Sequence, residues 1–362
     1  MKLSRKAIII LLISSICIFI HVYGLNDSNV EAGYSTHFYP AWARFLRTIF
    51  GRVPFSLGDI LYAIAAILLL VAFFKVVRLL LRPGRRLYLR QKGSGLLYRL
   101  FLICASLYIL FNLSWGINYD RKGIATQLGL DMKKYSVTEL RDINCILVDK
   151  INLSKRFLIK SGSPYPDNSG LFERVKKSYD NIAGQYPYLS YQPPSLKSSL
   201  WSWVGNYTGF TGYYNPFTGE AQVNTSVPKF SQPFTACHEV GHQLGYAKEM
   251  EANFVGYLAA SSGTDTLFHY SVYLDLFTYA NRNLFYVDSA FARETRLALA
   301  PEVNADITEW IQFSNRHKNP VAPVVRWMYG KFLEGNRQPQ GILSYDEVTA
   351  FIIAYYKKFG RI

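Results

Sequence analysis

The sequence contains few cysteines, no internal repeat and no low-complexity tract. Only 4 of its 362 residues are cysteine, which is too few for the disulfide framework of a small secreted domain. Cys17 and Cys104 fall within long apolar runs, so Cys145 and Cys237 remain for one bridge, which no other feature supports. Hydrophobic residues make up 50% of the chain, and this share excludes a disordered or fibrous protein.

Acidic residues are scarce in the first third of the chain. Residues 1–118 hold 14 Lys and Arg against three acids, a net charge of +11, whereas residues 119–362 carry only +4. A basic excess often indicates nucleic-acid binding. Here it coincides with the longest apolar runs, so we interpret it as a signal of membrane topology and expect no nucleic-acid partner.

Three apolar runs in this basic part are long enough to cross a membrane as helices. They cover residues of about 7–23, 60–77 and 100–117. The first run follows a basic N-terminus, so a signal peptide cleaved after Gly24 is the alternative to an uncleaved anchor. We expect residues 1–118 to form a membrane anchor and residues 119–362 to form a separate domain.

The distribution of Lys and Arg around these helices predicts their orientation. With the N-terminus in the cytoplasm, eleven basic residues lie on the cytoplasmic side and seven on the other side. The domain of residues 119–362 is then extracytoplasmic. Between the first two runs, residues 40–52 combine arginines with apolar residues at helical spacing. This pattern suits either an interfacial helix on the membrane surface or a helix packed on the domain.

The second part of the chain has mostly helical patterns. Residues 136–155 begin with a Ser-Val-Thr-Glu capping box, and residues 169–186 form a second amphipathic segment. Between about 200 and 230 the composition changes to Gly, Tyr, Thr, Asn and Pro, which favours short strands and turns over helix. After Pro233 the helical patterns return. We therefore expect an α-rich α+β fold with a small β-sheet.

One motif carries recognisable chemistry, the sequence His238-Glu239-Val-Gly-His242. Residues four apart lie on one face of a helix, so both imidazoles can reach one tetrahedral Zn²⁺. Glu239 lies beside them and can take a proton from a water on that ion. This is the H-E-x-x-H arrangement of zinc metallopeptidases. The alternative is a surface helix with two unrelated histidines.

A catalytic zinc site needs a third protein ligand. Gly245 lets the chain turn after the motif, and the next segment offers Glu249 and Glu251. We choose Glu249 as the ligand and keep Glu251 as the alternative. Either acid would otherwise be an ordinary residue in the first turn of a helix. A metzincin would have a histidine at the next ligand position, where this chain has Lys248.

The segment Glu249-Met-Glu-Ala-Asn253 resembles the E-x-x-A-D helix of gluzincin-type peptidases. The resemblance implies that Glu249 binds zinc and that the residue at the last position orients a ligand histidine. This chain has Asn253 where those peptidases have Asp. An amide oxygen can still accept the imidazole N–H, but the contact carries no charge.

Most of the chain, and most specifically the region from Gly209 to Ala259, also resembles a bacterial family of multi-pass membrane proteins, domain of unknown function 3810. The likeness is carried by Asn215-Pro-Phe-Thr-Gly-Glu220, by Pro233-Phe-Thr and by the two segments around the motif. It implies a zincin-like domain anchored in a membrane, here the bacterial inner membrane, with no established substrate.

These features together predict a membrane-anchored zinc metallopeptidase. Zn²⁺ bound by His238, His242 and Glu249 would activate a water, with Glu239 as the general base. The expected partners are the membrane and a peptide or protein substrate associated with the cell envelope. The alternative is a catalytically inactive peptidase-like protein that binds peptide or cell-envelope material. The sequence carries no signal for the oligomeric state.

Overall fold

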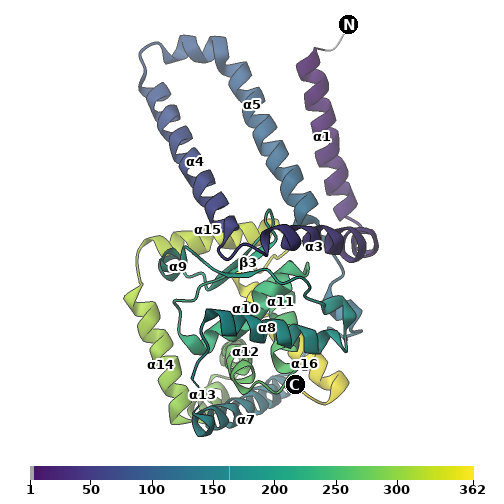
Figure 1. Ribbon diagram of the computed structural model, residues 1–362, viewed down its shortest axis with the longest axis vertical. Helices are drawn as coiled ribbons and strands as arrows, with labels where there is room; N and C mark the ends of the chain where they lie inside the picture. Colours follow the sequence, from purple (N-terminus) through teal and green to yellow (C-terminus); the bar gives the residue numbers. More distant parts are fainter. Residues whose placement is uncertain (1–3, 163) are drawn as a thin grey trace.

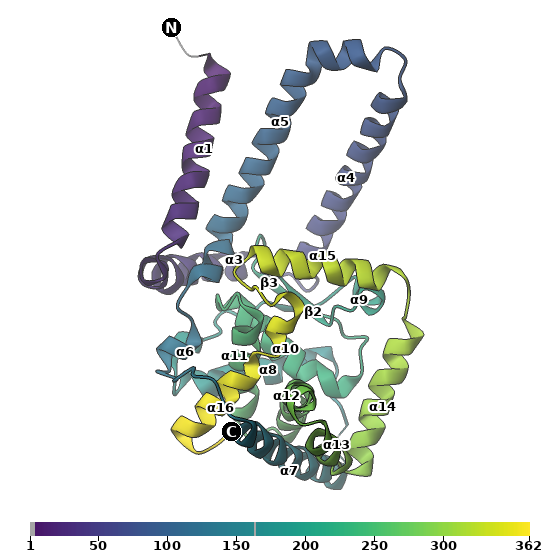
Figure 2. The same ribbon diagram turned by 180° about the vertical axis from the view of Figure 1, so that it is seen from behind.

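The computed structural model describes residues 4–162 and 164–362 and consists mainly of helices (Figure 1). Three long helices stand at one end of the molecule, and the other elements form a folded part beneath them (Figures 1 and 2). The described residues contain one β-sheet, of three strands. This confirms the prediction of a mostly helical chain with three apolar N-terminal helices and a small sheet.

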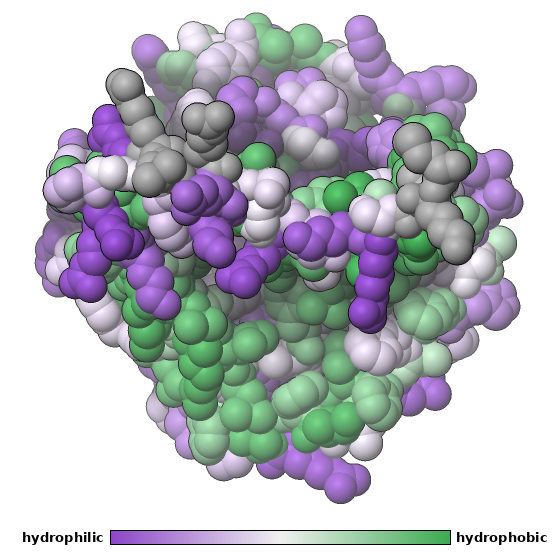
Figure 3. All heavy atoms as spheres, turned by 90° about the horizontal axis from the view of Figure 1, so that it is seen from above, coloured by the Kyte–Doolittle hydropathy of each residue, from purple (hydrophilic) through white to green (hydrophobic). Residues whose placement is uncertain are grey.

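The three long helices are α1 (Arg5–Gly24), α4 (Leu57–Leu81) and α5 (Arg85–Ser114). The segments Arg5–Gly24, Leu57–Leu81 and Gln91–Ser114 are each long and apolar enough to cross a membrane. Most of their large apolar side chains are exposed, and the view from above shows broad hydrophobic surface (Figure 3). Apolar surface of this extent is not found on soluble monomers, so the chain is a membrane protein.

The third span ends earlier than the sequence predicts. α5 stops at Ser114, and a 3₁₀ helix, η2 (Gly116–Asp120), follows it. Trp115, Ile117 and Tyr119 are buried in the folded part. These residues are apolar because they belong to a protein core, and composition alone does not distinguish that environment from a bilayer.

The loop between the first two spans forms α2 (Asp27–Asn29), the π-helical segment η1 (Val30–Phe38) and α3 (Tyr39–Phe50). α3 buries Tyr39 and Leu46 against the folded part and exposes Phe45 and Ile49 on another side. The helix expected over residues 40–52 therefore packs on the folded part along one face and leaves an apolar face open.

The helix with the His238–His242 motif and the helix that begins at Glu249 lie at the centre of the folded part. Its remaining helices are α6 (Ile124–Gln127), α7 (Val137–Ser161), α8 (Asn168–Ala183), η3 (Pro187–Leu189), α9 (Ser202–Thr208), η4 (Lys229–Ser231), α10 (Gln232–Gln243), α11 (Glu249–Ser261), α12 (Thr266–Val287), α13 (Ser289–Leu297), α14 (Pro301–Arg316), α15 (Val321–Gly335), η5 (Gly341–Tyr345) and α16 (Val348–Phe359). α7 begins with the predicted capping box of Ser136 and Glu139. α7 packs along α12, and one apolar core joins both helices to α8, α10, α11 and α16.

The cysteines do not pair. All four are free, with Cys145 exposed on α7 and Cys237 buried in α10. The single bridge that the sequence left open is therefore absent from the described part of the chain.

The sheet joins β1 (Leu196–Ser198), β2 (Gly212–Asn215) and β3 (Glu220–Val223) in the order β1-β3-β2. β3 runs parallel to β1 and antiparallel to β2, with Tyr214 opposite Ala221. The region of residues 200–230 also contains the short helix α9, which its composition did not predict. β2 is an edge strand and contacts α10, so the edge of the sheet lies beside the motif.

The second span is attached to the sheet at its first turn. The backbone N–H groups of Leu57 and Gly58 donate to the Glu220 carboxylate of β3 at 3.3 and 2.6 Å. Asp59, in the same turn, accepts a hydrogen bond from the Tyr213 hydroxyl of β2. Carboxylates at a helix N-terminus satisfy free N–H groups and offset the helix dipole. This span and the sheet therefore hold each other in place.

Candidate metal centre

α10 and α11 bring the residues of the motif together. α10 is buried along its whole length, and Gly245, with a φ of +88°, lets the chain turn back after it. α11 then packs closely on α10, because a Cβ atom on Gly256 would lie only 3.0 Å from the backbone N of His238. This close approach puts the first turns of α11 beside His238 and His242.

The two histidines point their Nε2 atoms at one carboxylate oxygen. Glu249 Oε2 lies 3.3 Å from His238 Nε2 and 3.5 Å from His242 Nε2. The imidazole rings are perpendicular, with centroids 4.7 Å apart. Glu239 belongs to the same cluster, since ligand-type atoms of His238, Glu239 and His242 all lie within 4.8 Å of one another. Several atoms that can bind a metal therefore surround one small volume.

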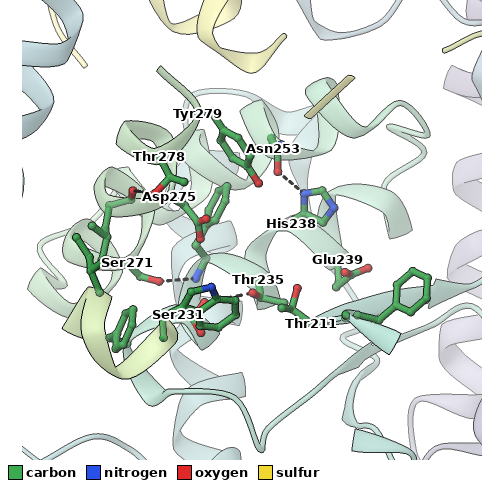
Figure 4. Close-up of a pocket in the computed structure, with 18 of the residues that line it drawn as sticks. Thr211, Ser231, Thr235, His238, Glu239, Asn253, Ser271, Asp275, Thr278 and Tyr279 are labelled. Carbon is green, nitrogen blue, oxygen red and sulfur yellow. Dashed lines mark hydrogen bonds between the residues drawn. The ribbon is translucent and has the colours of Figure 1, made fainter. Parts of the chain in front are cut away.

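The other ring nitrogen of each histidine is held by an acceptor. The Nδ1–H of His238 donates to Asn253 Oδ1 at 2.7 Å (Figure 4). The Nδ1–H of His242 donates to the backbone carbonyl of Tyr246 at 2.8 Å. A neutral imidazole with its proton on Nδ1 has a lone pair on Nε2. When Nε2 is deprotonated, these acceptors therefore keep the remaining proton of each ring on Nδ1, which is the tautomer that can ligate a metal through Nε2.

Glu249 is held at the start of α11 by two further contacts. The Tyr329 hydroxyl of α15 donates to Glu249 Oε1 at 2.5 Å, and the Glu249 backbone N–H donates to Gln338 at 2.9 Å. Burial alone would raise the pKa of Glu249, but the charges and hydrogen bonds of the two histidines hold this pKa well below its usual range. The attraction of Glu249 likewise raises the pKa of His242, although burial opposes this shift. Glu249 is therefore an anion at the middle of the cluster.

Glu239 lies beside the histidines but faces the sheet. Its carboxylate approaches Gly212 of β2, where an added Cβ would lie 2.5 Å from Glu239 Oε1. Glu239 Oε2 is buried and has no hydrogen-bond partner among the described residues. Burial raises the pKa of Glu239 to about 7. A carboxyl group with a pKa in this range can both accept and release a proton near neutral pH.

His238 and Glu239 open onto a cavity of about 510 Å³. Glu239 and Thr211 lie on one side of it, and Asp275, Thr278 and Tyr279 of α12 lie on the other (Figure 4). Its apolar lining comes from Phe210, Phe230, Phe234, Leu274, Ile307, Trp310 and Ile311. Burial raises the pKa of Asp275 to about 7. The cavity thus offers apolar walls with a carboxyl group on each of two sides.

Glu251, the alternative ligand, lies away from the histidines. Its carboxylate rests directly against Gly123, and its nearest positive charges are Lys248 and Arg121. Two positions along an α-helix point in directions about 200° apart. The structure accordingly brings Glu249, and not Glu251, to the two Nε2 atoms.

A buried ion pair supports the turn after α10. Two N–H groups of Arg121 donate to the Glu31 carboxylate at 3.0 and 2.8 Å, and a third donates to the Gly245 carbonyl at 3.2 Å. The Arg121 guanidinium also lies 4.5 Å from the centre of the Tyr246 ring. Glu31, from the loop between the first two spans, therefore helps through Arg121 to hold the Gly245–Tyr246 turn, whose next carbonyl, that of Tyr246, orients His242.

Several residues of the site were not found by sequence reasoning. Tyr246 acts through its backbone carbonyl, which any residue type would provide. Tyr329 lies 80 positions from Glu249 and looks like an ordinary tyrosine of an amphipathic helix. Asp275 offers the one usable signal, because it is a lone acid within the apolar sequence Tyr-Ser-Val-Tyr-Leu-Asp-Leu-Phe-Thr-Tyr.

The fold and the site define an integral membrane protein whose folded part contains a buried cluster of histidine and glutamate. The chain belongs to the family described as protein of unknown function DUF3810, whose sequence profile matches residues 34–353. This match confirms the family resemblance, which the sequence indicated over most of the chain. No curated protein and no solved structure matches the chain.

Proposed function

We propose that the protein is a zinc-dependent hydrolase of peptide bonds. The observation that carries this proposal is the convergence of two histidine Nε2 atoms on Glu249 Oε2. Ligand atoms about 2.0–2.1 Å from a tetrahedral zinc ion lie about 3.3 Å apart, close to the observed N···O distances of 3.3 and 3.5 Å. Glu249 Oε2 is buried and faces both Nε2 atoms, as suits a ligand oxygen.

His238, His242 and Glu249 would hold the ion and leave one position open. An ion bound in this way supplies Lewis acidity, which polarises a carbonyl group and lowers the pKa of water. Asn253 and the Tyr246 carbonyl would keep the histidine ligands oriented. These residues make a zincin-like centre of the gluzincin type, with an amide in place of a carboxylate behind His238.

Glu239 is the proposed general base. It lies next to His238, borders the cavity and is held against Gly212 of the edge strand. In hydrolysis it would accept the proton of the attacking water and then pass that proton to the leaving amine as the peptide bond breaks. Its position on α10 keeps it within reach of both events.

β2 offers a binding edge for an extended substrate. The carbonyls of Thr211 and Asn215 accept hydrogen bonds from the N–H groups of the residues that flank β3, Asn224 and Gly219. Gly212 lies between them in a non-hydrogen-bonded position, so its own N–H and C=O point to the open edge. A peptide added along this edge as a further strand would pass Glu239 and place a side chain in the cavity.

We further propose that the folded part lies on the extracytoplasmic side of a bacterial inner membrane. Eleven basic residues flank the spans on the N-terminal side and seven on the side of the folded part, and Lys and Arg prefer the cytoplasmic side. The substrate would then be a peptide or protein of the cell envelope. Enzymatic reporters fused after Ile362 and within the α4–α5 turn should report opposite sides, and cytoplasmic activity of the Ile362 fusion would reverse the orientation.

The metal content of the full-length protein tests the hydrolase proposal. Protein purified in detergent without chelator should hold about one zinc ion per chain. His238→Ala combined with His242→Ala should abolish zinc binding, whereas His269→Ala combined with His317→Ala, outside the cluster, should not. Persistent absence of zinc after reconstitution would remove the basis for the proposal. Zinc without hydrolysis of any peptide would identify a catalytically inactive binding protein instead.

A further inference from the structure

α15 has an apolar face that the other described elements leave largely exposed. Trp327 and Met328 are 64% and 60% exposed. The exposed apolar residues of this helix recur at intervals of three and four, which aligns them in one stripe. This stripe, called the α15 stripe below, consists of Val321, Val324, Trp327, Met328 and Phe332.

The opposite face of α15 fixes the direction of the stripe. Leu333 and Gly330 are buried, and the Tyr329 hydroxyl binds Glu249 at 2.5 Å. The Tyr329 ring also packs edge-on against Phe210 of the cavity wall, with centroids 5.3 Å apart. Rotating α15 to bury the stripe would break all of these contacts, so the stripe must face outward.

α15 lies directly beneath the membrane spans. It runs crosswise at the level of α3, just below the lower ends of α4 and α5 (Figures 1 and 2). Phe332, at the end of the stripe, packs edge-on against Phe111 of the third span, with centroids 6.3 Å apart. The stripe is thus continuous with a surface that already faces lipid. Next to α15, helix α9 adds Trp203, which is 62% exposed.

We propose that α15 lies in the interfacial layer of the bilayer that the three spans cross. Burying the stripe in the headgroup and acyl boundary removes its apolar area from water. Trp is the residue type that prefers this boundary. Lys331 beside the stripe pairs with Glu334 at 2.6 Å on the same exposed surface, and its side chain is long enough for the amine to reach lipid phosphate groups as well. The occupant of the stripe is therefore lipid, because the spans bring the membrane to it.

This arrangement places the candidate metal centre close to the membrane. The outward face of α15 contacts lipid and the inward face contacts Glu249, so the two are separated by roughly one helix diameter, about 10 Å. If the proposed hydrolase function holds, its substrates are peptide bonds near the membrane surface. The lipid contact itself does not depend on that function.

Spin labels in the full-length protein test the lipid contact. With Cys17, Cys104 and Cys145 replaced by Ala, labels would be attached at Val324→Cys or Met328→Cys in nanodiscs of phosphatidylcholine and phosphatidylglycerol. The control is Leu297→Cys, since Leu297 is apolar and 83% exposed but belongs to α13, which lies at the far end of the molecule from the spans (Figure 1).

Labels at 324 and 328 should collide readily with oxygen and lose accessibility to a water-soluble nickel chelate, whereas the label at 297 should show the reverse. Equal nickel accessibility at all three positions would overturn the proposal. Shielding of 324 and 328 from both reagents would also overturn it, because protein would then cover the stripe. A measurement without labels covers the case in which a labelled variant fails to fold. Brominated lipid should quench the part of the tryptophan fluorescence that comes from Trp327, which is the part lost in Trp327→Phe. Absence of this quenching would refute the contact.

Discussion

The backbone carbonyl of Tyr246 holds the Nδ1–H of His242 at 2.8 Å, so the end of α10 orients a side chain of the same helix. The Tyr246 N–H donates to the Gly241 carbonyl at 3.2 Å, and the Gly245 N–H donates to the His242 carbonyl at 3.0 Å. This is the hydrogen-bond pattern of a Schellman turn. Because the turn sets the position of the carbonyl, a change at Gly245 should alter the candidate metal centre without changing any proposed ligand.

Gly245→Ala should weaken zinc retention and lower stability by about 1 kcal/mol or more, because a side chain is strained at positive φ. Its Cβ would also lie 2.9 Å from the Tyr39 ring. Gly162→Ala is the control, since Gly162 also has a positive φ, ends α7 and has open space around it. Zinc titration against a competing chelator measures the effect, and equal zinc affinities in the two variants would show that the turn does not orient His242.

Glu239→Gln should keep zinc and lose hydrolysis. The amide has nearly the same shape but cannot accept the proton of the attacking water, so the rate should fall by roughly 10²-fold or more. Zinc content and thermal stability should stay at wild-type values. Cleavage of a quenched fluorescent peptide library measures the rate. Cleavage by the variant at the full rate would rule out Glu239 as the general base.

Glu249→Gln and Glu251→Gln should differ in metal retention. Loss of the charged ligand Glu249 should weaken zinc binding by at least the roughly 10 to 100-fold seen when supporting partners are lost. Glu251 faces Gly123 on another side of the helix, so Glu251→Gln should leave zinc binding unchanged. Equilibrium dialysis of the two variants compares them directly. If only Glu251→Gln releases zinc, the ligand assignment is wrong by two residues.

The pair of Glu31 and Arg121 should lose its stabilising effect in acid. Burial alone would raise the pKa of Glu31, but the hydrogen bonds and charge of Arg121, with a further bond from Gln127, bring it below its ordinary value. A carboxyl whose pKa is lower in the folded state stabilises the fold above its unfolded pKa of about 4.3. This contribution disappears as the pH falls through the folded pKa.

Glu31→Gln should therefore lower stability near neutral pH by about 1.5–3 kcal/mol, the range for hydrogen bonds to a charged group. The gap between wild type and variant should narrow as the pH falls below about 4. Thermal unfolding in detergent across this range measures the gap. Glu309→Gln, on an exposed position of α14, is the control. A gap for Glu31→Gln that stays constant down to about pH 3 would contradict the pairing.

The sequence predicted the features that depend on local spacing. The positions of His238, Glu239 and His242 within one motif place them together on any helix, and long apolar runs identify spans without knowledge of the fold. The end of the third span was beyond such reasoning. Trp115 and Tyr119 are as apolar as membrane residues, and only the surrounding tertiary structure shows that protein covers them.

Features that depend on tertiary contacts were not predictable. Glu249 and Glu251 are chemically identical, and the choice between them depends on how α11 is rotated against α10. The contact of Gly256 with the His238 backbone helps to set that rotation. The sequence indicated Glu249 only through the likeness of Glu249-Met-Glu-Ala-Asn253 to the gluzincin helix, and not through the rotation itself. Tyr329 reaches the site only because α15 crosses above it, so its role appears only after the chain has folded.

The attachment of Glu220 to the first turn of α4 means that the second span is part of the framework of the folded part as well as its anchor. A soluble fragment starting at Tyr119 would strip two backbone donors from the Glu220 carboxylate and the Asp59 partner from Tyr213. The strand that borders Glu239 would then rest on a sheet whose Glu220 carboxylate keeps only the Thr218 hydroxyl as a hydrogen-bond donor among the described residues. Removing the membrane helices to gain solubility would thus disturb the very edge on which substrate recognition is proposed to depend.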